Sequence, residues 1–99
     1  MEMFNPPHAG EILLEEYIKP LGFTVSAFAL KIGTSRKNLS EIVNEKVGIS
    51  PEMALKLAKA LGTSPEIWLR LQCKYDLWHA KQNVNLDNVE VVCKKKEIA

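Results

Sequence analysis

Residues 24–44, TVSAFALKIGTSRKNLSEIVN, constrain the fold more than any other part of the chain. They encode two short helices whose apolar residues recur at helical spacing on the inward faces, at Phe28, Ile32, Leu39 and Ile42. Ala29 is small where the helices would cross, and Gly33 permits the left-handed turn that reverses the chain. This pattern is typical of a DNA-reading helix-turn-helix. The alternative is a helical hairpin that binds nothing.

The outward face of the second of these helices is polar in an unusual way. An ordinary surface helix carries Glu/Lys pairs one turn apart, whereas this face carries Ser35, Arg36, Lys37, Asn38, Ser40 and Glu41. Arg36 and Lys37 suit guanine O6 and N7, and Glu41 can accept from cytosine N4, so we predict that these three residues read base edges. Phosphate contacts fix register without reading sequence; they are predicted for Thr24, Ser26, Ser35, Asn38, Ser40, Asn44 and Lys46.

Charge is distributed unevenly, although the formal net charge of the 99 residues is only +1. Any nucleic-acid footprint must therefore come from local charge. Basic residues gather around the predicted reading helix, at Lys31, Arg36, Lys37 and Lys46. Acidic residues gather on the first predicted helix, at Glu11, Glu15 and Glu16. The alternative is that these charges only solvate the faces on which they lie.

Proline, glycine and capping residues predict one all-α domain over residues 1–81, with five helices, followed by a tail over 82–99. Two prolines at 6–7 keep the lead-in extended until a first helix at about 9–18. The predicted N-caps of the second and third helices are Thr24 and Thr34.

The fourth and fifth helices share a start pattern, which is Ser50-Pro51-Glu52 in one and Ser64-Pro65-Glu66 in the other. Each combines an N-cap, a first-turn proline and an acidic side chain that complements the helix dipole. The fifth helix should run to about residue 81. The repetition is a recurring start pattern and does not indicate a repeat protein.

The fifth helix has two apolar faces, and both must be buried. One face holds Ile67, Trp68, Leu71, Tyr75 and Trp78, and can close the small domain. The other centres on Leu69, Cys73 and Leu77, and needs either the tail, whose residues 89–92 are β-like, or a second molecule. We favour a homodimer contact, because dimeric helix-turn-helix proteins place two reading helices about 34 Å apart.

Catalytic, metal and membrane functions find little support in the sequence. Cys73 and Cys93 form no CxxC pair and no zinc spacing with His8 or His79, so we expect two reduced thiols, with Cys73 packed on its helix, and no metal or cofactor. The N-terminus lacks the pattern of a signal peptide, and no apolar stretch approaches a membrane span of about 20 residues. We expect a cytoplasmic protein that is not an enzyme.

Three runs of sequence resemble the HigA family of bacterial antitoxins, also labelled virulence-associated protein I. They are FNPPHAGEIL at 4–13, NEKVGISPEMA at 44–54 and LGTSPEIWL at 61–69. The family belongs to the phage-repressor-like (XRE, Cro-type) helix-turn-helix group. The resemblance covers about residues 4–72, weakens toward 81, and is most specific over 49–72.

This resemblance implies a five-helix DNA-binding antitoxin that neutralises a HigB-type toxin, a small mRNA-cleaving endonuclease, and represses the operon that encodes both. An RNA-cleaving toxin should be basic around its site, so the acidic helix with Glu11, Glu15 and Glu16 is the expected contact. One departure concerns Val25. Many repressor-like relatives have glutamine there, so the phosphate contact of that glutamine is in question here.

We therefore predict a homodimeric, DNA-binding antitoxin and autorepressor. One alternative is a free-standing repressor of the same fold with no toxin, and a neighbouring small basic reading frame would separate the two. Another alternative is a protein-interaction adaptor that has lost DNA binding. Arg36 and Lys37 on an open polar face argue against the adaptor, whereas the near-neutral net charge leaves room for it.

Overall fold

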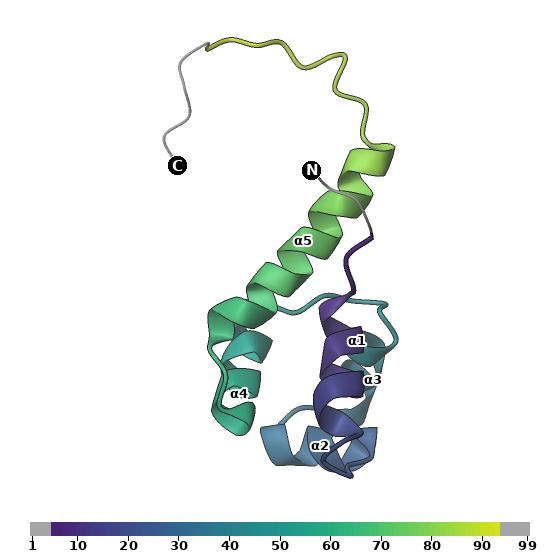
Figure 1. Ribbon diagram of the computed structural model, residues 1–99, viewed down its shortest axis with the longest axis vertical. Helices are drawn as coiled ribbons and strands as arrows, with labels where there is room; N and C mark the ends of the chain where they lie inside the picture. Colours follow the sequence, from purple (N-terminus) through teal and green to yellow (C-terminus); the bar gives the residue numbers. More distant parts are fainter. Residues whose placement is uncertain (1–4, 94–99) are drawn as a thin grey trace.

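The computed structural model describes residues 5–93 and contains helices but no strand within that range (Figure 1). The prediction of an all-α fold is confirmed. In chain order the elements are α1 (Ala9–Leu13), the π-helical η1 (Leu14–Ile18), α2 (Val25–Ile32), α3 (Arg36–Val43), α4 (Pro51–Leu61) and α5 (Pro65–Asn83). Because η1 continues α1 directly, the two form the single first helix expected at 9–18. Residues 1–4 of the predicted lead-in, and 94–99 of the tail with its three lysines, lie outside the described residues.

Each helix begins at a polar cap whose side chain accepts a hydrogen bond from a backbone N–H in the first turn, which has no partner within the helix. The caps are His8, Thr24, Ser35, Ser50 and Ser64. The prediction that Thr34 caps the third helix is therefore wrong by one residue. Ser35 is the cap, and the Thr34 hydroxyl instead accepts from the Asn38 side chain at 2.9 Å.

The core lies where α1, α3 and α4 meet the start of α5 (Figure 1). Its largest fully buried side chains are Leu13, Ile18, Leu39, Ile42, Leu57 and Trp68. The Trp68 indole N–H donates to the Thr63 hydroxyl at 2.8 Å, so its one polar atom is satisfied. Helices α1 and α3 cross closely at Gly10, where a β-carbon would overlap the Ile42 carbonyl.

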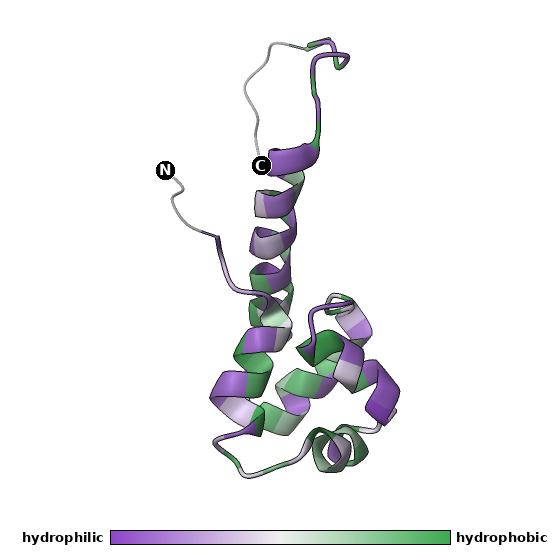
Figure 2. Cartoon of the chain, turned by 90° about the vertical axis from the view of Figure 1, so that its right-hand side faces the viewer, coloured by the Kyte–Doolittle hydropathy of each residue, from purple (hydrophilic) through white to green (hydrophobic). Residues whose placement is uncertain are grey.

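Helix α5 extends well beyond the bundle formed by the other helices (Figure 2). At 19 residues it is about 28 Å long, and the molecule measures 50 × 25 × 24 Å along its principal axes. Its buried residues, Trp68 and Gln72, lie in its first half. In the described range no helix has both the length and the apolarity needed to cross a membrane.

The tail after α5 does not form the predicted β-like segment. Residues 84–93 are coil with one turn, in which the Val89 N–H donates to the Leu86 carbonyl at 3.0 Å. A strand needs a neighbouring strand to satisfy its backbone groups, and the described part of this chain offers none. The tail also leaves α5 uncovered, and its own apolar residues are exposed: Val84, Leu86, Val89, Val91 and Val92.

Candidate nucleic-acid interface

Helices α2 and α3 form the helix-turn-helix that the sequence predicts. Gly33 has φ 73° and ψ 39°, the left-handed conformation that a residue without a β-carbon adopts without strain. The N–H of Gly33 donates to the Leu30 carbonyl, and that of Thr34 to the Ala29 carbonyl, so the end of α2 is closed before α3 begins. Phe28 and Ala29 are buried, as are Ile32, Leu39 and Ile42.

Lys56 of α4 holds the turn from the outside. Its ammonium donates to the Gly33 carbonyl at 3.1 Å and lies 3.6 Å from a carboxylate oxygen of Glu52. A cation at the C-terminal end of α2 also complements the negative end of that helix dipole. This role of Lys56 could not be predicted from the sequence, because its partner is a backbone atom 23 positions away.

Helix α3 presents a polar face to solvent and an apolar face to the core. Leu39, Ile42 and Val43 are buried, whereas Arg36 and Lys37 in the first turn are exposed. Neither of these two cations belongs to a salt bridge between described residues. Their charges are therefore available to a ligand that approaches this end of the helix. Glu41, the third predicted base-reading residue, is half-buried one turn further along the same side.

The predicted phosphate-contacting residues fall into two groups. Thr24, Ser26, Ser35 and Asn38 are exposed near the starts of α2 and α3. The Thr24 and Ser35 hydroxyl oxygens accept from backbone N–H groups at 3.0 Å. As acceptors they keep their own O–H free to donate to a phosphate oxygen.

The second group lies at the end of α3. The Asn44 amide donates to the backbone carbonyl of Ser40 at 2.9 Å and to its hydroxyl at 3.2 Å, so in this conformation it serves its own helix. Lys46 is exposed in the following loop. Val25 is half-buried against the core and offers no polar group.

Gln72 holds the end of the loop that carries Lys46, a contact that could not be predicted from the sequence. Gln72 is 6% exposed, and its side-chain carbonyl accepts from the Ile49 N–H at 3.1 Å. A β-carbon on Gly48 would lie 2.9 Å from the Gln72 side chain, so a larger residue there would have to displace the Gln72 amide group. Glu45 has φ 63°, a left-handed conformation that costs free energy in a residue with a side chain.

Gln72 also connects this loop to the start of the chain. Its amide donates to Asp76 at 3.1 Å and lies 3.4 Å from Nε2 of His8. His8 is 3% exposed, and its Nδ1 accepts from the Gly10 N–H at 2.8 Å as the cap of α1. His8 is thus a buried packing residue. The one sequence clue to Gln72 was its position between two apolar faces of a helix that must bury both.

The remaining predicted site residues lie away from α3. Leu69 is half-buried, while Cys73 and Leu77 are exposed. All three line an open groove of about 420 Å³ along α5 with Ile49 and Asp76. The expectation that Cys73 is packed is wrong for a single chain, because nothing in the described range covers this face. Cys73 and Cys93 are both free thiols.

The predicted toxin-contacting residues share the exposed side of the first helix. Glu11, Glu15 and Glu16 are all exposed, and Glu15 pairs with Lys19 at 2.9 Å. An exposed pair one helical turn apart contributes little to stability. Within residues 5–93 no cluster of three or more His, Cys, Asp or Glu side chains could hold a metal ion.

Comparison with known proteins agrees with this geometry. The helix-turn-helix family model HTH_3 matches residues 14–68. An HTH-type transcriptional regulator of Haemophilus influenzae is 45% identical over 79 residues, which cover 80% of this chain and 74% of the relative. Antitoxin HigA-1 of Vibrio cholerae is 41% identical over 77 residues, which cover 78% of this chain and 72% of the relative.

Comparison with solved structures also finds antitoxins of this fold. The antitoxin GraA matches with 42% identity and a TM-score of 0.78, over 81% of this chain and 86% of GraA. A second structure, of GraA in complex with its operator, matches with 35% identity and a TM-score of 0.76, over 100% of this chain and 98% of that one.

Proposed function

This chain belongs to the helix-turn-helix family that includes antitoxin HigA-1 and virulence-associated protein I, and from that premise we propose that it is the DNA-binding antitoxin of a type II toxin–antitoxin system. It neutralises a HigB-type mRNA-cleaving toxin and represses its own operon. The resemblance to HigA found in the sequence is confirmed. The observation that carries the proposal is the open polar face of α3, with Arg36 and Lys37 unpaired at its first turn among the described residues.

In the proposed complex α3 enters the major groove of operator DNA. Arg36 and Lys37 donate to guanine O6 and N7, and Glu41 accepts from cytosine N4. Thr24, Ser26, Ser35, Asn38, Ser40, Asn44 and Lys46 contact phosphates and set the register. Asn44 must give up a bond to Ser40 to do so. The complex of GraA with its operator supports this proposal, because the match extends over this whole chain.

A homodimer is the proposed reading unit, because one helix in the major groove reads only half of a two-fold operator. Leu69, Cys73 and Leu77 form its interface. Two facts support this: the face they share is apolar, and it is uncovered in the single chain.

The toxin is proposed to bind the acidic side of the first helix through Glu11, Glu15 and Glu16. A basic RNA-cleaving enzyme is complementary to this surface. The three glutamates are exposed and lie on a different helix from Arg36 and Lys37, so toxin and DNA can be bound together. We propose that the protein acts by binding, without catalysis, in the cytoplasm where operator and messenger RNA are found.

Purification with the product of the neighbouring gene, followed by binding to the DNA upstream, tests the proposal. We expect a stable complex that binds the upstream DNA and suppresses mRNA cleavage. Reversal of charge with Glu11→Lys and Glu15→Lys should weaken toxin capture and leave DNA binding intact. Glu66→Lys, at an exposed glutamate of α5 that is in no salt bridge between described residues, serves as the matched control. Upstream DNA binding without any toxin partner would instead establish a free-standing repressor, and toxin affinity unchanged by the charge reversal would exclude the acidic helix as the contact.

A further inference from the structure

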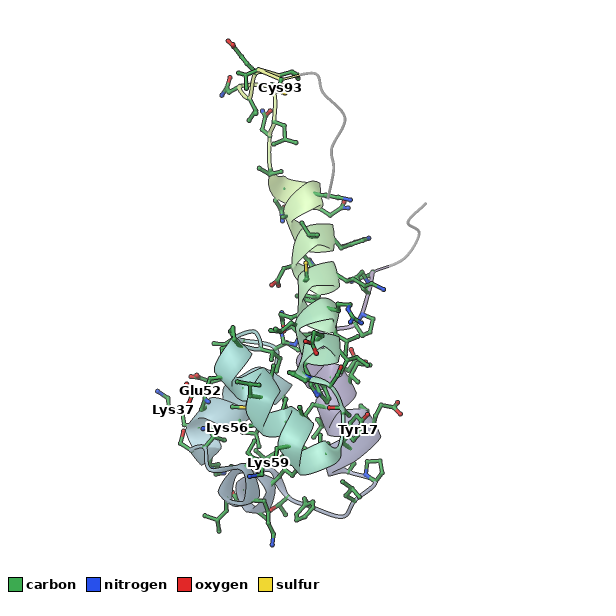
Figure 3. All side chains as sticks on the ribbon, turned by 90° about the vertical axis from the view of Figure 1, so that its left-hand side faces the viewer. Tyr17, Lys37, Glu52, Lys56, Lys59 and Cys93 are labelled. Atoms are coloured by element: carbon green, nitrogen blue, oxygen red, sulfur yellow. The ribbon has the colours of Figure 1, made fainter. Side chains whose placement is uncertain are left out.

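A second surface combines exposed leucines with lysines, and none of its residues is among the proposed base, phosphate or toxin contacts. An open groove of about 640 Å³ lies between α2 and α4. Its apolar lining includes Leu30, which is 82% exposed, and Leu55, which is 62% exposed. Lys31 and Lys59 also line it, together with Lys56, which is already engaged with Gly33 and Glu52. In Figure 3, Lys37, Lys56 and Lys59 lie on one side of the bundle, opposite Tyr17.

The chemistry of the groove defines what it can bind. Leu30 and Leu55 favour an apolar ligand, because contact would remove their side chains from water. Lys31 and Lys59 are in no salt bridge with a described residue, so they favour carboxylates. The occupant should therefore be a short segment in which apolar and acidic side chains alternate, and which has no partner of its own.

The tail of this protein has that composition. Residues 84–93 carry five exposed apolar side chains, together with Asp87 and Glu90, and contain no lysine or arginine. The Val89 N–H donates to the Leu86 carbonyl, so Leu86 and Val89 are the ends of a turn that contains Asp87. The tail leaves α5 at the end of the molecule away from α2 and α4, and in this conformation it does not contact its own groove (Figure 1).

Pairing of two copies through the exposed face of α5 would bring the tail of one copy toward the groove of the other. The face is centred on Cys73, beside the middle residue of Pro65–Asn83. If the α5 helices of two copies pair antiparallel about Cys73, Leu69 of one copy meets Leu77 of the other. The same apolar face is then buried on both copies. The two bundles then lie at opposite ends of a helix about 28 Å long, which suits the separation of about 34 Å between reading helices.

In this register Asn83 lies opposite the partner's Thr63, two residues beyond the end of α4. The tail then starts close to the end of the partner's α4, whose last turn contributes Lys59 and Ala60 to the groove. From Ala60 back to Leu55 the groove follows α4 for about 8 Å, a distance that about two to three extended residues span.

We propose that residues 84–93 of each chain bind in the α2–α4 groove of a second copy, so that tails are exchanged across the dimer. Leu86 and Val89 cover Leu30 and Leu55, and Asp87 and Glu90 face Lys31 and Lys59. The inference rests on the proposed homodimer and extends it to a second, charge-matched contact. It accounts together for the uncovered apolar tail and the uncovered leucines of α2 and α4.

Photo-crosslinking of the full chain tests the exchange. A photoreactive amino acid in place of Val89 should give, on irradiation, a product of dimer mass on a denaturing gel, and peptide mapping should place the bond within 30–33 or 55–60. The same amino acid in place of Leu21, which is 57% exposed and outside the groove, is the control and should not label those segments. A product of monomer mass, or a bond mapped elsewhere, would overturn the proposal.

Charge reversal makes the test specific. Lys59→Glu should lower the yield about two- to fivefold, as expected for one exposed ion pair, and adding Glu90→Lys should restore it. Lys19→Glu, outside the groove, should change nothing. An equal yield in Lys59→Glu overturns the charge pairing. Sedimentation of the same samples distinguishes the tail exchange from the homodimer. A dimer without the crosslink contradicts the tail exchange alone, whereas a monomer contradicts the homodimer as well.

Discussion

Two regions differ in how completely one chain buries its apolar residues. One is the bundle, formed by α1 to α4 and the start of α5; the other is the outer part of α5 with the tail. In the bundle, caps, a glycine crossing and a Trp at the centre agree with one another, and Leu13, Leu39 and Leu57 are fully buried. Beyond Gln72 the chain continues to present apolar side chains, but Leu77 and Leu86 are exposed. The bundle is thus complete in itself, whereas the outer region has the composition of a structure that is completed by a partner.

The two tryptophans of α5 provide the sharpest comparison, because one lies in each region. Trp68→Ala should destabilise the fold by about 3–5 kcal/mol, since it empties a buried site and leaves the Thr63 hydroxyl without its donor. Trp78 is half-buried, so Trp78→Ala should cost only about 1–2 kcal/mol. Urea unfolding followed by circular dichroism measures both. Equal losses would show that the outer part of α5 is as tightly packed as the bundle.

A charge on the outer face of α5 should separate association from folding. Leu77→Asp would place an unpaired carboxylate in the proposed dimer interface, at a cost of several kcal/mol. Because Leu77 is exposed in the single chain, the helical content of the monomer should be retained. Sedimentation should show a monomer for the variant and a dimer for the parent at tens of micromolar. A monomeric parent would remove the dimer from the account.

Gln72 lies at the boundary between the two regions, and its replacement should affect the loop between α3 and α4, which carries Lys46. Gln72→Met keeps the approximate volume but leaves the Ile49 N–H without an acceptor, which should cost about 1–3 kcal/mol. Hydrogen exchange at Ile49 should accelerate, while exchange at Leu39 in the core should change less. Asp76→Asn keeps the Gln72 carbonyl and an oxygen that can accept from the Gln72 amide, so it is the matched control and should leave exchange at Ile49 unchanged. Unchanged exchange in Gln72→Met would mean that the loop is held by other contacts.

Lys46 should give the smallest effect in this series. Lys46→Ala removes one proposed phosphate contact, so it should weaken binding to all sequences similarly and reduce the salt slope by about one unit. Lys81→Ala, an exposed lysine near the end of α5, is the control and should leave the slope unchanged. A slope that stays the same in Lys46→Ala would place the loop away from the DNA backbone.

The same contrast explains which features could be predicted from the sequence. Caps, turn glycines and apolar spacing are local, and they gave the five helices, the turn at Gly33 and the buried face of α3. The cap of α3 was misplaced because Thr34 and Ser35 are adjacent and both can cap; only the hydrogen bond from Asn38 to Ser35 distinguishes them.

Features that depend on distant contacts could not be predicted. The bond from Lys56 to the Gly33 carbonyl, and that from Ile49 to Gln72, each join residues 23 positions apart with no pattern that links them. The β-like tail was predicted from residue type alone, although a strand requires a partner strand. The predicted base-reading and interface residues lie on exposed faces, and their roles remain predictions until a complex is measured.

Binding of Arg36→Ala to the upstream DNA, beside the parent and at several salt concentrations, tests the central claim most directly. In the proposed complex α3 reads base edges through its first turn. Arg36→Ala should therefore lose about 1–3 kcal/mol of binding free energy on the operator and no longer discriminate at one base pair. If the variant binds the operator with the parent's affinity and the parent's base preference at every position, α3 does not read DNA in the way proposed here.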